Sequence, residues 1–197
     1  MPVLTNLQSA LTQKEIQLYF TDTKTQQAIA DLGWSGKILA VKTNQDYLLV
    51  INANINGQKS DAKIQQTIDH QAEIQKDGSI INTVTITRNH LGKAGEQMYG
   101  QPNFDYIRIY VPENSELLSA GGVTWPDETM FKTPKKWYKK DLALAQMEKE
   151  IKIDNLSGTK ITKEFGKTTF GNWLITNPGQ SNQIVFSYKL PFKITNN

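Results

Sequence analysis

The stretch IQKDGSIINTVTITRNH, residues 74–90, contains the strongest structural signal in the chain. From Ile80 onward, apolar and polar side chains alternate, and this two-residue period indicates a β-strand with one buried face. The KDG sequence at residues 76–78 predicts a hairpin turn, because glycine tolerates the positive φ that such turns require. Residues 62–75 carry apolar side chains mostly at even positions. We therefore predict two long antiparallel strands that meet at this turn.

Much of the remaining chain consists of similar short runs bounded by turn residues. Six or more such strands with hairpin turns favour a mainly β fold, and we predict an immunoglobulin-like antiparallel β-sandwich. Residues 141–150 are rich in helix formers and predict a short helix. The other predicted strands are residues 36–42, 46–52, 104–111, 117–118, 160–165, 168–176 and 183–192.

The first part of the chain follows a different pattern. Apolar residues recur at helical spacing from Leu4 to Leu11, and Asp22 can cap a second helix. Between these helices, the apolar run Ile16–Phe20 has the length of a buried strand. A helix-strand-helix segment does not fit inside a sandwich. We therefore expect an α/β segment over residues 3–32, the end of an upstream unit, followed by a sandwich domain over residues 33–197.

The composition narrows the class of protein. With 197 residues, of which 38% are hydrophobic and 21% charged, the chain is ordinary for a globular protein. Its apolar runs are far shorter than the roughly 20 residues that span a bilayer, so we expect no membrane span in this chain. The N-terminus shows no signal-peptide pattern. Cysteine is absent, which excludes disulfide bonds and thiolate zinc sites.

Positive charge is concentrated late in the chain. Residues 1–131 carry 10 lysine and arginine residues against 14 acidic ones, whereas residues 132–197 carry 12 against 5. Five of these twelve lie in KTPKKWYKK, residues 132–140, within an irregular excursion over residues 123–140. Lysines interleaved with aromatic rings are suited to holding anions and stacking on other rings. The candidate binding residues are Trp125, Lys135, Lys136, Trp137, Tyr138, Lys139 and Lys140.

Two interpretations of this excursion stay open. In the first, it is an exposed contact surface for an anionic cell-envelope polymer, for anionic lipid headgroups or for another surface protein. In the second, it is a solvated loop whose aromatic side chains pack on the sandwich while its lysines stay in water. A specific nucleic-acid site is disfavoured, because the net charge is only +3 and no recognition fold is evident.

The stretch INANINGQKSD, residues 51–61, has the asparagine spacing of a calcium loop and part of a phosphate loop. The twelfth position, where calcium loops place a bidentate glutamate, is Lys63. Gln58 separates the glycine and lysine that a phosphate-binding loop needs side by side. We therefore interpret the stretch as a connection between strands. The alternative is a ligand site formed by Asn54, Lys59 and Asp61.

No residue pattern indicates catalysis. Neither His70 nor His90 has further ligands at a metal-binding spacing, and nucleophile motifs such as Gly-x-Ser-x-Gly are absent. Acidic residues are frequent between Asp105 and Glu128, but no two of them have a spacing that marks a catalytic pair. We therefore predict a non-enzymatic domain without cofactor, metal or catalytic residues.

Three segments carry a resemblance to a known family. They are residues 32–90, which begin LGWSGKILAV; FDYIRIYVPENSELLSAGG, residues 104–122; and FGKTTFGNWLITNPGQSNQIVFSYKLP, residues 165–191. The most specific elements are Tyr-Val-Pro-x-x-Ser-x-Leu-Leu in the second segment and Asn-Pro-Gly-Gln…Tyr-x-Leu-Pro in the third. Together they resemble the C-terminal part of the bacterial family called domain of unknown function 4012.

The resemblance implies a membrane-anchored, extracytoplasmic protein of the bacterial cell surface. Such proteins have one N-terminal transmembrane helix and an upstream half with a Gly-Gly-Phe motif, and this chain would correspond to the part that follows. The activity of the family is unknown, so the resemblance implies no catalytic residues. The expected role is a binding or structural domain. The alternative is an accessory domain of a protein that processes or carries envelope glycopolymer, with its active part upstream.

Overall fold

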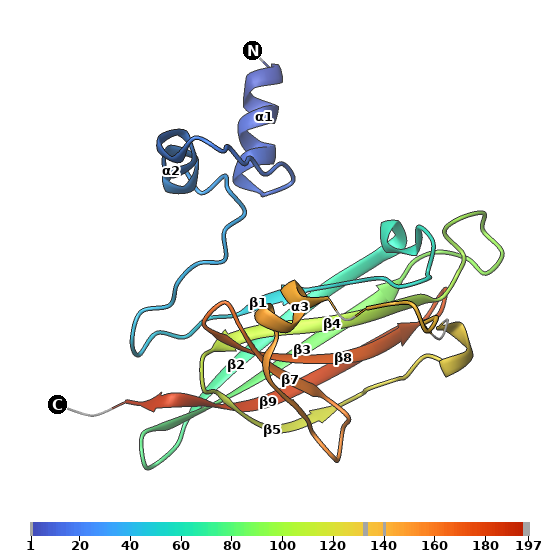
Figure 1. Ribbon diagram of the computed structural model, residues 1–197. Coiled ribbons are helices and arrows are strands. Elements are labelled where there is room, and N and C mark those ends of the chain that lie inside the picture. The colour runs from blue at the N-terminus through green and yellow to red at the C-terminus, as the bar shows by residue number, and fades with distance from the viewer. Residues whose placement is uncertain (1, 132–133, 140, 195–197) are drawn as a thin grey trace. The chain divides into compact units, whose positions relative to one another are not determined.

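The structure is a computed structural model that describes residues 2–131, 134–139 and 141–194 (Figure 1). The chain divides into two compact units, Met1–Ala40 and Val41–Asn197, slightly further along than the boundary expected from the sequence. The helices of the first unit are short, and the second unit contains two antiparallel sheets. The predicted mainly β fold with short N-terminal helices is therefore confirmed.

The N-terminal unit contains helix α1 (Pro2–Thr12) and helix α2 (Thr23–Asp31). Asp22 caps α2 as predicted, because its carboxylate accepts a hydrogen bond from the Thr25 backbone N–H at 2.8 Å. The strand predicted at Ile16–Phe20 is wrong. This run forms no strand and is mostly exposed, because every strand of the described residues lies in the other unit and none pairs with it.

The second unit stacks its two sheets as layers (Figure 1). One sheet has five strands in the order β1-β4-β8-β7-β6, and the other has four in the order β2-β3-β9-β5. All described pairings within the sheets are antiparallel. The strands are β1 (Leu49–Ile51), β2 (Ile64–Ile74), β3 (Ser79–His90), β4 (Asn103–Pro112), β5 (Glu116–Gly121), β6 (Lys149–Ile153), β7 (Lys160–Glu164), β8 (Lys167–Thr176) and β9 (Ser181–Lys193).

The long hairpin predicted from residues 62–90 is present as β2 and β3. Their register continues without a shift along the whole of β2. At the turn, Gly78 has a φ of 79°, and its N–H donates to the Gln75 carbonyl at 2.9 Å, as the KDG signal predicts. β2 is an edge strand of its sheet. The hairpin therefore leaves one side of β2 open.

Two parts of the five-stranded sheet differ from the prediction. β1 is only three residues long, and residues 36–42, predicted as a strand, form none. The sequence predicts a helix over residues 141–150, but helix α3 (Leu142–Met147) ends earlier and β6 follows it. All β6 side chains are exposed. The sequence of β6 therefore need not alternate between polar and apolar residues, and it gives little indication of a strand. Short 3₁₀ helices occupy Ser60–Lys63 and Glu128–Met130.

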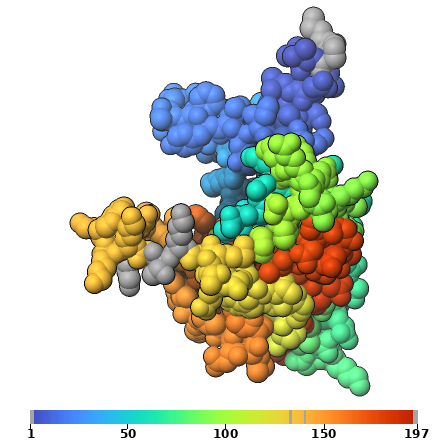
Figure 2. All heavy atoms as spheres, turned by 90° about the vertical axis from the view of Figure 1, so that its right-hand side faces the viewer, coloured from blue at the N-terminus to red at the C-terminus, as the bar shows by residue number. Residues whose placement is uncertain are grey.

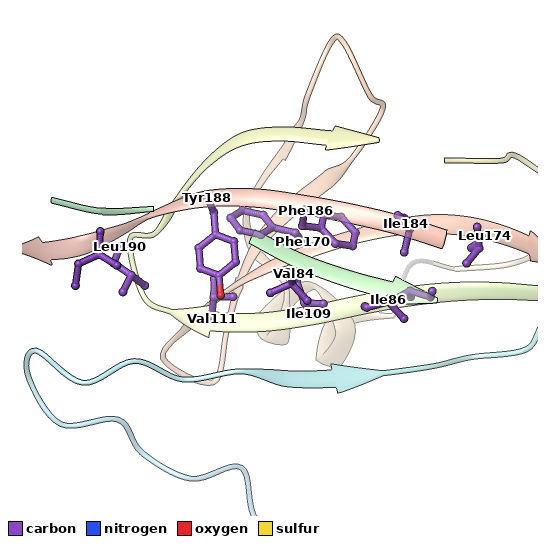
Figure 3. Packing of buried hydrophobic residues seen from close by; sticks show 12 residues of the cluster. Val84, Ile86, Ile109, Val111, Phe170, Leu174, Ile184, Phe186, Tyr188 and Leu190 are labelled. Carbon is purple, nitrogen blue, oxygen red and sulfur yellow. The ribbon is translucent and has the colours of Figure 1, made fainter. Parts of the chain in front are cut away.

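The hydrophobic core lies between the two sheets (Figure 3). β3 contributes Val84 and Ile86 from its predicted inward face, and the threonines that alternate with them, Thr83, Thr85 and Thr87, are only partly buried. The rings of Phe170 and Tyr188, which come from opposite sheets, meet with centroids 5.7 Å apart. The buried cluster consists of Ile80, Val84, Ile86, Ile107, Ile109, Val111, Phe170, Leu174, Ile184, Phe186, Tyr188 and Leu190.

We expect Phe186→Ala to lower the free energy of unfolding by about 3–5 kcal/mol, because it leaves a cavity in this close-packed layer. Urea denaturation followed by circular dichroism measures the change. Leu156→Ala is the control, since that side chain is 97% exposed and its loss should cost less than about 0.5 kcal/mol. Equal effects of the two substitutions would contradict the position of the core.

Candidate functional site

One end of the sandwich holds a cluster of polar side chains centred on Arg88. This residue follows Ile86 on the inward face of β3, and its side chain is only 3% exposed. Its Nη1 atom lies 2.8 Å from Oδ2 of Asp105 on β4. Its Nη2 atom donates to Asp61 at 2.9 Å and to Asn103 at 3.1 Å. The guanidinium therefore joins the two sheets and the segment that precedes β2.

The stretch at residues 51–61 wraps around this cluster. Asn54 forms an isolated β-bridge with Asp105, and Oδ1 of Asp105 accepts the Ala53 N–H at 2.7 Å. The Asn54 amide donates to the Ser60 hydroxyl at 3.1 Å. The structure thus brings Asn54 and Asp61 together, whereas the Lys59 side chain is exposed. The stretch connects β1 to β2, as the interpretation of a connection between strands predicts.

The electrostatics of Asp105 reflect its position. Burial raises the pKa of this carboxyl to about 6, against the lowering effects of Arg88 and of the Ala53 N–H. Oδ1 accepts the Ala53 N–H, and Oδ2 forms no hydrogen bond but is in ion-pair contact with Nη1 of Arg88. The group is therefore placed to hold the sheets together and not to exchange protons with a ligand.

The two histidines also have local partners. His90 is buried, its Nε2 lies 2.9 Å from the Gln101 carbonyl, and its Nδ1 accepts the Gly92 N–H at 3.1 Å. This arrangement places the ring proton on Nε2. The Nε2 of His70 lies 3.6 Å from the Asp46 carboxylate. Across the described residues, no group of three His, Asp or Glu side chains is placed to hold a metal ion.

The basic excursion forms an exposed tip, which we call the basic loop, residues 134–139. In Figure 2 its gold atoms stand out from the sandwich. Lys135, Lys136 and Lys139 are exposed. Trp137 is 70% exposed and stacks on Tyr138, with ring centroids 4.4 Å apart. The predicted candidate Lys140 lies outside the described residues.

The part of the excursion that precedes the basic loop packs on the sandwich. The Phe131 ring lies 5.5 Å from that of Trp173, which in turn lies 5.0 Å from Tyr106. Trp125 lies against Gly158 in the β6–β7 connection, where an added Cβ would come within 2.8 Å of the indole. Aromatic packing on the sandwich therefore involves Phe131 and Trp125, while the rings of the basic loop remain accessible.

The opposite end of the sandwich, where β4 and β9 finish and β8 begins, carries three adjoining grooves. We call them the end grooves, and their volumes are about 230, 350 and 360 Å³. The first and third share Glu150 and Lys163. The second shares Asn114 with the first and Glu113 with the third. The grooves therefore adjoin one another along one surface.

Unusual backbone conformations gather around the end grooves. Eight non-glycine residues of the described chain have positive φ. Four of them, Asn44, Asn114, Glu150 and Phe165, line the grooves. The left-handed region costs most side chains about 1–2 kcal/mol, and asparagine less. Such conformations cluster at functional sites, so this end of the sandwich is a second candidate binding surface.

Neither Arg88 nor the end grooves were identified from the sequence. Arg88 occupies an inward position of an alternating strand, and a charge at such a position is a detectable signal of a buried network. The grooves are built from residues far apart in the chain, such as Asn114, Glu150 and Phe165. No local pattern joins them.

Comparisons with known proteins found no match for the chain among protein-family models, curated proteins or solved structures. In the part of the chain that the structure describes, no helix is long and apolar enough to cross a membrane.

We expect Arg88→Met to lower the free energy of unfolding by about 3–5 kcal/mol at neutral pH, because it leaves Asp105 as a buried, unpaired charge. Without the guanidinium, the folded-state pKa of Asp105 rises further above its unfolded value of about 3.9. The folded variant then keeps a proton on Asp105 that the unfolded chain releases. Proton binding therefore stabilises the folded variant at low pH, and this stabilisation is lost as pH rises. The deficit should therefore be smaller at about pH 5 than at about pH 8.

Denaturation curves for Arg88→Met and the wild type at several pH values measure both quantities. Lys193→Met provides the control, because it removes an exposed ion pair with Asp77 and should cost less than about 1 kcal/mol. A deficit for Arg88→Met that is equally small, or that does not change with pH, would show that the pair is not the buried contact described here.

Proposed function

We propose that this chain is a non-enzymatic, extracytoplasmic binding domain of a bacterial cell-surface protein, and that the basic loop contacts an anionic envelope polymer. The cellular location in this proposal rests on the resemblance to the C-terminal part of the domain of unknown function 4012 family. The binding role rests on one observation. The stacked Trp137–Tyr138 pair is exposed among three exposed lysines at the tip of the basic loop.

The geometry favours a contact surface over a merely solvated loop. The exposed Trp137 and Tyr138 rings stack on each other, and they give a partner flat faces to stack on. The surrounding ammonium groups attract an anionic chain before contact is made. Attachment at Phe131 holds the base of the excursion on Trp173. The tip is therefore presented on a fixed base, which lowers the entropy lost on binding.

The scaffold fits a domain of this kind. The chain passes between the two sheets after β1, β3, β4, β5 and β8, and such connections support the immunoglobulin-like part of the proposal. Domains of this architecture carry binding loops at the surface of a rigid core. The same arrangement serves whether the partner is a polymer or another surface protein.

The test is retention on immobilised wall teichoic acid, an anionic glycopolymer, across a series of salt concentrations. Each exposed lysine contributes on the order of 0.5–1 kcal/mol to attraction by an anionic surface. Replacing Lys135, Lys136 and Lys139 with serine should therefore weaken binding about tenfold to a hundredfold and reduce its dependence on salt.

A matched control replaces Lys14, Lys24 and Lys37, which are also exposed, with serine. It changes the net charge by the same amount and should leave retention nearly unchanged. If both triple variants lose affinity equally, attraction is non-specific and the basic loop is not the contact surface. Vesicles containing phosphatidylglycerol, tested in parallel, separate a polymer ligand from lipid headgroups.

A further inference from the structure

We propose that the end grooves bind a neutral sugar chain and that the ring of Phe165 is the platform on which one sugar stacks. This site is separate from the basic loop and does not depend on the polyanion binding proposed above. Three observations carry the inference: a turn residue with an unfavourable backbone conformation, a strand residue with positive φ that lines the same groove, and a lining that matches a polar ligand.

Phe165 is poorly suited to its position in the chain. With Gly166 it forms the two-residue turn between β7 and β8, and their φ values are 52° and 67°. Turns with positive φ at both residues favour asparagine or aspartate followed by glycine. The Phe165 side chain is 57% exposed, so burial does not explain it either. An exposed ring in a costly conformation beside a groove is what a ligand contact would account for.

Glu150, which lines the same groove as Phe165, also has an unfavourable backbone conformation. It has a φ of 51° and lies where the pairing of β6 with β7 shifts register between Lys149 and Lys152. This irregularity brings the Glu150 carboxylate to 2.8 Å from Nζ of Lys163, and the contact raises the pKa of Lys163. Strand irregularities of this kind redirect side chains next to binding sites. Glu150 and Lys163 then form a polar pair shared by two of the grooves.

The lining of the grooves indicates the chemistry of the ligand. Carboxylates, ammonium groups, amides and hydroxyls are mixed, as in Glu113, Lys163, Gln146 and Thr162. An apolar ligand would leave these groups without partners. The two carboxylates, Glu113 and Glu150, are mixed with Lys42, Lys149, Lys152 and Lys163, so the lining carries both signs of charge and suits a polar ligand. A neutral sugar presents hydroxyls that both donate and accept hydrogen bonds, together with a face of C–H groups that can cover an aromatic ring.

The extent of the grooves suits a chain of sugars more than a single ring. Small-molecule pockets usually measure about 300–1,000 Å³, and the separate grooves lie at or near the lower limit, at about 230, 350 and 360 Å³. Because they adjoin, one extended ligand can occupy several of them. Gln146 and Met147 of α3 line one groove, so the helix that follows the basic loop also forms part of this wall.

The test uses the whole chain with two neutral probes, cellohexaose and chitohexaose, and amide-resolved NMR. We expect at least one probe to shift signals at residues 113–114, 149–152 and 163–166. In Phe165→Asn, affinity should fall about tenfold or more, the scale of one lost aromatic contact. The melting temperature of that variant should rise by a few degrees, because asparagine suits the turn. A variant that binds more weakly and is also more stable cannot be explained by unfolding.

Two further variants complete the design. Phe165→Trp keeps an aromatic platform and should retain binding, whereas Tyr19→Asn removes an exposed ring in the N-terminal unit and should change nothing. The proposal is wrong if neither probe shifts the groove signals, if Phe165→Asn binds as tightly as the wild type, or if its melting temperature falls. None of these outcomes depends on whether the basic loop binds teichoic acid.

Discussion

The contact between Arg88 and Asp105 is the constraint on which the arrangement of the two sheets depends. Arg88 belongs to β3 and Asp105 to β4, so their ion pair crosses the layer that separates the sheets. A planar guanidinium makes its contacts in fixed directions, and a buried charge without a partner is costly. Sliding one sheet over the other would separate the two groups. The pair therefore selects one alignment of the sheets, although the hydrophobic layer supplies most of the stabilising free energy.

The two ends of the sandwich differ in how their polar groups are used. At the Arg88 end, Asp105, Asp61 and Asn103 find partners within the protein, and the connection from β1 to β2 covers them. At the other end, polar side chains line open grooves, and residues such as Phe165 adopt conformations that the fold does not favour. Buried polar contacts of this kind hold the structure in one arrangement. A set of polar groups facing solvent, held at a conformational cost, is available for recognition.

The sequence predicts those parts of the fold in which a local pattern matches the final environment. β3 alternates because one face meets the core, and the KDG turn fixes its pairing with β2. The run Ile16–Phe20 has the composition of a strand but no strand to pair with, and β6 has a partner but side chains that remain exposed. The basic loop could be predicted from the sequence because its lysines and aromatic residues are consecutive. The end grooves could not be predicted from the sequence, because their residues are far apart in the chain and only folding brings them together.

The open side of β2 leaves backbone hydrogen-bonding groups available to neighbouring molecules. The Gln75 N–H bonds to the Ser79 carbonyl, and the Leu91 N–H bonds to the Lys63 carbonyl. Odd-numbered residues of β2 therefore pair with β3, and the backbone groups of even-numbered residues face outward. The isoleucines of β2 are among these even-numbered residues, and the strand has no lysine, proline or bulge, so Asp69 and Glu73 are the charged side chains that protect this sheet edge. In a concentrated solution, this strand is the place where self-association would begin.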